Sequence, residues 1–337
     1  MKKTISLLGA LLVAQLLLAF GLSFTGPRLS ARSADKPLFS LAGGDVDRIT
    51  IEGPDQAKVV LAKVGGAWQL PDEGNFPADK ARADALVKTL EGLKEGMPVA
   101  TTSQALARFK VGDERFERRI TLAGAGKTLA TLYFGTSPSM REIHARRSGQ
   151  RDVYSVAFAT YQAPAKAESW EDKAILQIPK KDIEAIDVAG LHIARVSVTP
   201  EAAQPEWEAT GLAKGEALDT KAADKLAGLL ADLRIDAVLG KNAKPDYGLD
   251  RPVLALSLVK AGGQTIDYAL GKEKDGKTYT LKASTRDEYF RLPDYTASPL
   301  LDAAKRDKLL AAPEASHAPA AKLAKPAAKL AKPVAKG

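Results

Sequence analysis

One pattern occurs twice in this chain of 337 residues, and it constrains the fold more than any other feature. The pattern Leu41-x-x-x-Asp45-Val46-x-x-Ile49-x-Ile51 returns further along the chain as Ile178-x-x-x-Asp182-Ile183-x-x-Ile186-x-Val188. Further pairs follow at nearly the same separation: Trp68 with Trp207, Leu86 with Leu226, Phe109 with Tyr247, Phe134-Gly135 with Leu270-Gly271, and Arg151-Asp152-x-Tyr154 with Arg286-Asp287-x-Tyr289. This nearly constant offset predicts two tandem repeats of one unit, at residues 37–172 and 173–311.

The hydrophobic spacing inside one unit predicts an α+β fold. Residues 46–51 alternate between polar and apolar, as in a half-buried strand. Residues 58–63 and 67–70 flank Gly65-Gly66, which is typical of a hairpin. Asp79 is a suitable helix N-cap in the first unit, as is Asp219 in the second, and the leucines that follow each of them recur at helical spacing. Further hairpins follow that helix. Because strands follow one another without regular β-α-β alternation, each repeat is predicted to be a mainly antiparallel sheet with one main helix.

The N-terminal segment predicts where the protein resides. Residues 5–24 contain no charged side chain, and as a helix they would span ~30 Å, the thickness of a bilayer core. Lys2 and Lys3 favour an N-terminus in the cytoplasm. We therefore expect residues 1–36 to form a membrane anchor and linker, and the bulk of the chain to be periplasmic at a bacterial inner membrane. A cleaved signal peptide is the alternative, although this apolar run is longer than usual.

Residues 312–337 are expected to be a disordered, low-complexity tail. They consist mainly of Ala, Lys and Pro, and AKLAKPA at residues 321–327 is followed by AKLAKPV at residues 328–334. Too few apolar groups are present to offset the entropy of ordering. The tail is either a solvated arm or a cationic segment that touches anionic lipid or an envelope polymer.

The net charge of +8 comes from the two ends of the chain. Residues 1–36 and residues 312–337 each carry five cations against one acid, which leaves residues 37–311 with no net charge. A nucleic-acid-binding domain carries its basic excess on the folded part. The charge distribution therefore argues against a nucleic-acid partner.

Few residues of this chain offer catalytic or metal-binding chemistry. Cysteine is absent and only three histidines are present, so no cofactor or metal site is expected. The run Gly124-Ala125-Gly126-Lys127-Thr128 lacks the first glycine of a phosphate loop and precedes a predicted strand, so it is interpreted as a hairpin turn. His144 is expected at a half-exposed strand position, and His192 has no evident partner.

Four carboxylate pairs are candidate acid–base groups. They fall near predicted turns, where solvated side chains are expected. The four pairs are Asp45 with Asp47, Asp113 with Glu114, Glu171 with Asp172, and Asp246 with Asp250. With no catalytic constellation, the chain is predicted not to be an enzyme.

One polar motif is present in both repeats and is the candidate interaction surface. Arginine and tyrosine are enriched in protein interfaces. The alternative interpretation is a hairpin with arginine and aspartate at its turn and tyrosine packed inward. The candidate residues are Arg151, Asp152, Tyr154, Arg286, Asp287 and Tyr289.

Several of these motifs together resemble a known family. They are the Ala-Trp-Gln-Leu of residues 67–70, Phe76-Pro77-Ala78-Asp79 before a leucine-periodic helix, and Tyr247-Gly248-Leu249-Asp250-x-Pro252. With the N-terminal anchor they resemble the bacterial domain of unknown function 4340 family, over roughly residues 38–310. The first unit departs from the family turn at Phe109-Lys110-Val111-Gly112. The resemblance implies a duplicated, membrane-anchored accessory protein, often encoded beside gliding-motility-type ABC transporter components, with no assigned catalytic residue.

We therefore expect a non-enzymatic, membrane-anchored periplasmic accessory protein. Its expected partner is a protein of the envelope, such as an ABC-transporter-type complex. The alternative is a binding module for envelope glycan or lipid, with its ligand in a cleft between the two repeats.

Overall fold

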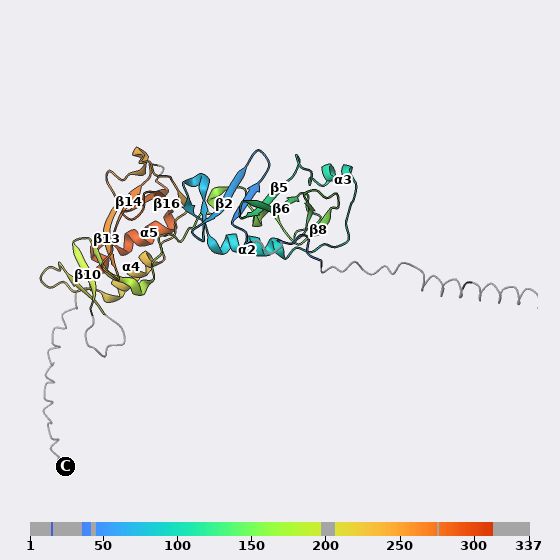
Figure 1. Ribbon diagram of the computed structural model, residues 1–337. Coiled ribbons are helices and arrows are strands. Elements are labelled where there is room, and N and C mark those ends of the chain that lie inside the picture. Colours follow the sequence, from blue (N-terminus) through green and yellow to red (C-terminus); the bar gives the residue numbers. More distant parts are fainter. Residues whose placement is uncertain (1–14, 16–35, 42–44, 197–205, 275, 313–337) are drawn as a thin grey trace, which may run out of the picture. The chain divides into compact units, whose positions relative to one another are not determined.

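The computed structural model describes residues 15, 36–41, 45–196, 206–274 and 276–312 (Figure 1). The fold is α+β, with two antiparallel sheets and few helices, as the sequence predicted. In the described part, no helix is both long enough and apolar enough to cross a membrane. Apart from residue 15, the predicted anchor at residues 5–24 lies outside the described residues, and so does almost all of the predicted tail.

The chain divides into two compact units. The first unit runs to Leu176 and also includes Arg234–Asn242. The second comprises Gln177–Leu233 and the chain from Ala243 onward. The short return to the first unit was not predicted. It is held by backbone and side-chain hydrogen bonds, because Ile235 N donates to Lys173 O at 3.1 Å and Lys173 Nζ donates to Asp236 O.

The first unit contains an eight-stranded sheet in the order β4-β3-β2-β1-β5-β6-β7-β8. The strands are β1 (Arg48–Glu52), β2 (Lys58–Val64), β3 (Ala67–Leu70), β4 (Phe76–Pro77), β5 (Arg118–Gly124), β6 (Lys127–Phe134), β7 (Ile143–Arg147) and β8 (Tyr154–Val156). Its helices are α2 (Lys80–Glu91) and α3 (Ser103–Arg108), with short 3-10 turns at Pro71–Glu73, Thr160–Gln162 and Ala167–Ser169. Figure 1 shows α2 running along one side of this sheet.

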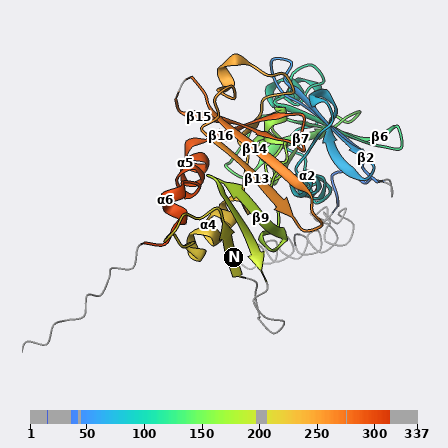
Figure 2. The same ribbon diagram turned by 90° about the vertical axis from the view of Figure 1, so that its left-hand side faces the viewer.

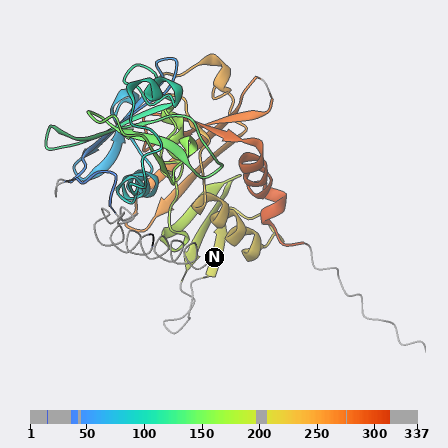
Figure 3. The same cartoon turned by 90° about the vertical axis from the view of Figure 1, so that its right-hand side faces the viewer.

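Seven strands of the second unit form a sheet in the order β11-β10-β9-β13-β14-β15-β16, and the short β12 belongs to the segment Arg234–Asn242. The strands are β9 (Ile183–Val188), β10 (Leu191–Val196), β11 (Glu206–Thr210), β12 (Ala237–Val238), β13 (Leu254–Lys260), β14 (Thr265–Lys272), β15 (Thr278–Ala283) and β16 (Tyr289–Pro293). The helices are α4 (Thr220–Ala231), α5 (Asp294–Ala303) and α6 (Arg306–Leu309), with 3-10 turns at Lys180–Asp182 and Pro245–Tyr247. Figure 2 shows α4, α5 and α6 gathered beside this sheet, and Figure 3 shows these gold and red helices from the opposite side.

Seven strands of one sheet correspond in order to seven strands of the other. The order β3-β2-β1-β5-β6-β7-β8 matches β11-β10-β9-β13-β14-β15-β16. The registers match as well, because Ile49 lies opposite Leu122 as Ile186 lies opposite Leu258. In both units the main helix falls between the third and fourth of these strands along the chain. Each starts at the predicted N-cap, since Asp79 accepts from Arg82 N and Asp219 from Ala222 N.

A tryptophan joins the main helix to the sheet in each unit. The Trp68 Nε1 donates to Asp84 on α2 at 2.8 Å, and the Trp207 Nε1 donates to Asp224 on α4 at 3.5 Å. Both rings are buried. Hydrogen bonds from a lysine and from the indole lower the pKa of both carboxyls. This arrangement satisfies an indole N–H that would otherwise be costly to bury.

A repeated glycine, just after β6 and near the end of β14, allows a close approach of two backbone segments. A Cβ on Gly271 would lie 2.2 Å from Tyr247 O, and one on Gly135 would lie 1.8 Å from Phe109 O. In the second unit Gly248 adopts the left-handed conformation that the turn needs, with φ of 67°. Lys110 takes the same conformation in the first unit, with φ of 53°. The departure from the family turn therefore changes the residue and keeps the backbone.

Candidate functional site

A row of polar side chains crosses the second sheet on the face opposite its buried apolar residues. The register places Thr210 opposite His192 and His192 opposite Asp187. Ser257 lies between Asp187 on one neighbouring strand and Asp267 on the other. Strands β11, β10, β9, β13 and β14 each supply one member of this polar row.

Hydrogen bonds connect members of the polar row. His192 Nδ1 lies 2.7 Å from Asp187 Oδ1, and Ser257 Oγ donates to Asp267 at 2.6 Å. The Asp267 N–H donates to Ser284 Oγ at 2.9 Å, which extends the row to the end of β15. The Asp187 and His192 side chains are 47% and 48% exposed, so both remain accessible to a ligand. In the described part of the chain, no lysine or arginine pairs with Asp187 or Asp267.

Beside the polar row, small residues leave a hollow of about 710 Å³ in the outer face of the second unit. Ala255 on β13 and Ala269 on β14 line it, and Gly190 in the β9–β10 turn and Gly211 just after β11 line one margin. Lys282 is opposite Ala269 on the next strand and donates to the backbone oxygens of the β15–β16 turn. The hollow also contacts Leu256 and Tyr268 from the core side, and burial raises the pKa of Tyr268 to about 12.

The same positions in the first unit carry large side chains. Ala255 lies opposite Ala269 in the second sheet, and the equivalent pair in the first sheet is Arg119 opposite Tyr133. Arg119 forms two hydrogen bonds of 2.5 Å with Glu52, which lower the pKa of that carboxyl. The Tyr133 ring is 5% exposed, and the Arg146 guanidinium stacks over it at 4.4 Å. These side chains fill the volume that is open in the second unit.

A separate loop covers the first unit's outer face. Val111, Tyr133 and Val153 form a small buried cluster there, distinct from the main core. Arg146 fixes the covering loop, because it donates to Val111 O at 2.6 Å and pairs with Asp113 at 2.5 Å. The hydrogen bond from Arg146 holds the pKa of Asp113 below its usual range. A hollow of about 480 Å³ remains at the β1–β2 turn, where Glu52 and Arg119 neutralise each other.

The order of the groups in the polar row differs from that of a nucleophilic triad. A nucleophilic triad needs a histidine between serine and carboxylate. Here Asp187 lies between His192 and Ser257, and strands two apart are separated by ~9.6 Å. Carboxyls that act as general acids are commonly shielded from water, whereas Asp187 is half exposed. The hollow combines two carboxylates, hydroxyls and an apolar floor, which is a set that orients a bound group.

The structure separates the predicted motif residues of the first unit. Tyr154 is buried in the core, with its hydroxyl 3.5 Å from Asp152. Arg151 is exposed and Asp152 is half-buried. This arrangement matches the alternative interpretation, a hairpin whose tyrosine packs inward.

In the second unit, the tyrosine of the Arg-Asp-x-Tyr motif does not occupy the core position that Tyr154 occupies in the first. Tyr289 is opposite Lys282 and its ring lies 5.3 Å from that of Tyr247. Arg286 pairs with the buried Glu288 at 3.0 Å, and Asp287 is exposed. The strand register makes Phe290, not Tyr289, the equivalent of Tyr154, because Phe290 lies opposite Leu281 as Tyr154 lies opposite Ala145. A role of the six motif residues in partner recognition stays a prediction.

Both strand histidines differ from the expectation. His144 is buried at 8% exposure, hydrogen-bonded to Thr136 and packed 4.2 Å from the Phe109 ring. His192 does have a partner, since the turn at Ala189-Gly190 folds it back onto Asp187. A contact across a hairpin turn follows neither strand nor helix spacing, so the sequence pattern did not reveal it. Among the described residues, no group of three His, Asp or Glu side chains is arranged to hold a metal ion.

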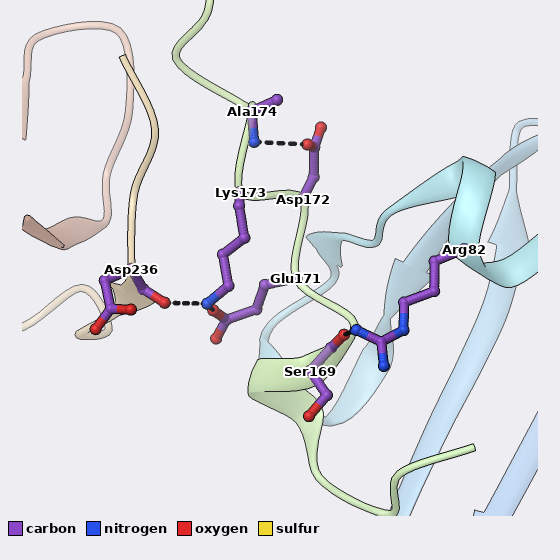
Figure 4. Close-up of polar contacts among 7 residues, drawn as sticks. All are labelled: Arg82, Ser169, Glu171, Asp172, Lys173, Ala174 and Asp236. Carbon is purple, nitrogen blue, oxygen red and sulfur yellow. Dashed lines mark hydrogen bonds and ion pairs between the residues drawn. The ribbon is translucent and has the colours of Figure 1, made fainter. Parts of the chain in front are cut away.

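The other motifs serve the fold. The glycine-rich run forms the β5–β6 hairpin turn, as predicted, with Ala125 and Gly126 at positive φ. Glu171 is buried rather than solvated and pairs with Lys173 at 2.8 Å (Figure 4). Figure 4 also shows Asp172 capping Ala174 N, and Arg82 donating to Ser169 O. This polar cluster fixes the end of the first unit.

The sequence held one signal for the polar row and the hollow. Each polar position in the second unit can be compared with its equivalent in the first. Asp187, Ser257 and Asp267 then align with Thr50, Thr121 and Thr131, which lie opposite one another in the same way. The two units therefore differ at alternate strand positions on one face, which is the pattern of a changed surface.

Comparison with known proteins places the chain in a family. The family described as Domain of unknown function (DUF4340) matches residues 68–252, more than half of the chain. The match begins at Trp68 and ends at Pro252 of the second unit's turn. No curated protein matches the chain. The chain therefore belongs to the DUF4340 family.

Proposed function

We propose that this protein is a non-enzymatic, membrane-anchored accessory protein of the bacterial envelope. Its second unit binds a segment of a partner protein, such as an ABC-transporter-type complex, in the hollow beside Asp187 and Asp267. The proposal rests on two features. One is the apolar segment at residues 5–24, and the other is a hollowed face whose carboxylates have no lysine or arginine partner among the described residues.

The charges and the open volume of the hollow are the main support for this proposal. Two carboxylates flank Ser257, and within the described residues no lysine or arginine neutralises either one. A partner segment with a lysine or arginine would supply the missing charge, and its neighbouring side chains would fill the space above Ala255 and Ala269. A partly desolvated ion pair of this kind contributes more to specificity than to affinity.

We also propose that the two units are copies of one ancestral unit that have diverged in use. The matched strand orders and registers support the common origin. The first unit closes its outer face with Tyr133, Arg146 and a covering loop. The second keeps the corresponding face open, which leaves it available for a partner.

An envelope glycan is the second candidate for the ligand. Ser257, Ser284 and the two carboxylates offer groups that hydrogen-bond sugar hydroxyls. A sugar ring would also need an aromatic ring to stack on. Tyr268 lines the hollow, but its phenol ring is buried and offers no exposed stacking platform. The protein partner is therefore favoured.

Photo-crosslinking in membranes tests the proposed function. A photoreactive amino acid replaces Thr210, an exposed residue at the end of the polar row. A second chain carries it at Lys221, an exposed residue on α4. The expected result is a crosslinked partner protein from position 210 and not from position 221. Products on purified cell-wall glycan instead would replace the protein partner by the second candidate.

Charge variants serve as the matched control. Asp187→Asn with Asp267→Asn removes both carboxylates from the hollow and is expected to reduce the crosslink about tenfold. Asp246→Asn with Asp302→Asn makes the same charge change at exposed surface ion pairs with Lys274 and Lys305 and should leave the crosslink unchanged. Equal crosslinking by both double variants, or no product at all, would contradict the proposal.

The membrane part of the proposal has its own test. A reporter fused to the C-terminus and the mass of the mature N-terminus are measured together. A periplasmic reporter with residues 1–24 still attached is expected. A shortened chain would favour a released binding protein, and a cytoplasmic reporter would overturn the envelope assignment.

A further inference from the structure

The end of the described chain is fixed at the margin of the hollow. Arg306, the first residue of α6, donates to Ala189 O at 3.2 Å and to Gly211 O at 2.9 Å. Both acceptor residues line the hollow. The same guanidinium pairs with Glu216 at 2.6 Å, and the pKa of Glu216 is lowered by the Ala213 N–H and by this guanidinium, which both donate to its carboxylate. Helix α6 is therefore held beside the candidate binding site.

The chain then continues along the loop that follows the hollow's margin. Leu310 forms a bridge with Leu218, and Ala311 N donates to Ala217 O at 2.8 Å. Residues 313–337 follow the described part. Fully extended they would reach ~80 Å, whereas the hollow spans only a few strands at ~4.8 Å each. Length does not prevent this segment from reaching the hollow.

The charges of the segment and the hollow are complementary. Residues 313–337 carry five lysines against Glu314. The hollow presents Asp187 and Asp267, and Lys282 is directed at backbone oxygens of its own turn. The register places Glu206 and Glu208 on the same face as Thr210, so the adjoining strand β11 adds acidic groups.

We propose that residues 313–337 dock in the hollow of the second unit and compete there with the partner. This inference rests on the proposed function, because the segment supplies in cis the lysines that a partner would supply in trans. A tethered segment acts at an effective concentration in the mM range, so even a weak contact occupies the hollow. Because the contact depends on attraction between opposite charges, added salt weakens the binding of the segment to the hollow.

Crosslinking within one chain tests the docking directly. The full chain in detergent carries the photoreactive amino acid at Thr210, and the products are mapped by mass spectrometry. Crosslinks to residues 313–337 are expected, reduced about tenfold by Asp187→Asn with Asp267→Asn and unaffected by Asp246→Asn with Asp302→Asn. Crosslinks that never map to residues 313–337, or that are equal in both double variants, would overturn the inference.

A peptide experiment measures the same contact without the tether. A labelled peptide of residues 313–337 is added to the chain ending at Ala312, and binding is followed by fluorescence anisotropy. We expect binding that weakens about tenfold in the Asp187→Asn, Asp267→Asn variant, and likewise when all five lysines of the peptide become glutamine. Binding that is indifferent to both changes would contradict docking in the hollow.

The partner crosslink separates this inference from the proposed function. In membranes, the chain ending at Ala312 should capture the partner from position 210 more strongly than the full chain. Partner capture without any tail crosslink would remove the docking inference alone. Tail crosslinks without partner capture from either chain would remove the proposed function and leave the docked tail standing.

Discussion

The outer faces of the two units have the same strand order, but large side chains fill one face and small ones leave the other hollow. In the first unit, Glu52, Arg119, Tyr133 and Arg146 follow one another across four paired strands, and a loop covers Tyr133 and Arg146. In the second, Ala255, Ala269 and Lys282 occupy the positions equivalent to Arg119, Tyr133 and Arg146, and a hollow of about 710 Å³ remains. The difference shows that one strand order accommodates either a closed or an open face, depending on alternate side chains of the strands.

The largest expected effect comes from opening the closed face. Tyr133→Ala removes a ring that is 5% exposed and leaves Arg146 and Val111 without their packing partner. We expect the free energy of unfolding of the first unit to fall by ~3 kcal/mol. Hydrogen exchange of peptides from β5 and β6 measures this loss, and peptides from β13 and β14 report the unchanged second unit. Full protection of β6 in this variant would show that the filled face does not stabilise the first unit.

An intermediate effect is expected from the ion pair that only the first unit contains. Arg119 lowers the pKa of Glu52 from its ordinary value of 4.5, so the folded state favours the charged carboxylate. The resulting stability is present at neutral pH and is lost as the pH falls through the lowered pKa. Glu52→Gln should therefore destabilise the first unit by ~1 kcal/mol at pH 7, and the difference from the unchanged protein should shrink toward pH 3.

Urea titrations of both chains at several pH values, followed by tryptophan fluorescence, measure this difference. Trp68 and Trp170 report on the first unit and Trp207 on the second. A difference that grows on acidification would contradict the assigned role of the pair.

The smallest effect on stability is expected from closing the open face. Ala269→Tyr places a ring at the position equivalent to Tyr133, where the hollow has room for it. The free energy of unfolding should stay within ~0.5 kcal/mol of the unchanged protein. Because the ring takes the volume of the ligand, partner and tail crosslinks from position 210 should both decrease about tenfold. Undiminished crosslinking would place the partner outside the hollow.

Local sequence signals predicted the elements of this fold well. Gly65-Gly66 predicted the β2–β3 hairpin, and Asp79 and Asp219 predicted the starts of the main helices. The nearly constant offset between the paired motifs predicted two units of the same type. The hairpin and cap signals are reliable because such features depend on a few adjacent residues. The predicted equivalence of Tyr154 and Tyr289 was wrong, because a shift of one residue turns a strand side chain to the other face of the sheet.

The amino-acid sequence by itself determined the α+β class, the family, the strand pairs joined by short turns and the position of each main helix. Only the tertiary structure decided that Asp187, Ser257 and Asp267 form one row. β9 and β13 are separated along the chain by β10, β11, α4 and β12, and they become neighbours only when the sheet assembles. Pairing across a long connection depends on the packing of the whole unit, so no local pattern encodes which polar side chains meet.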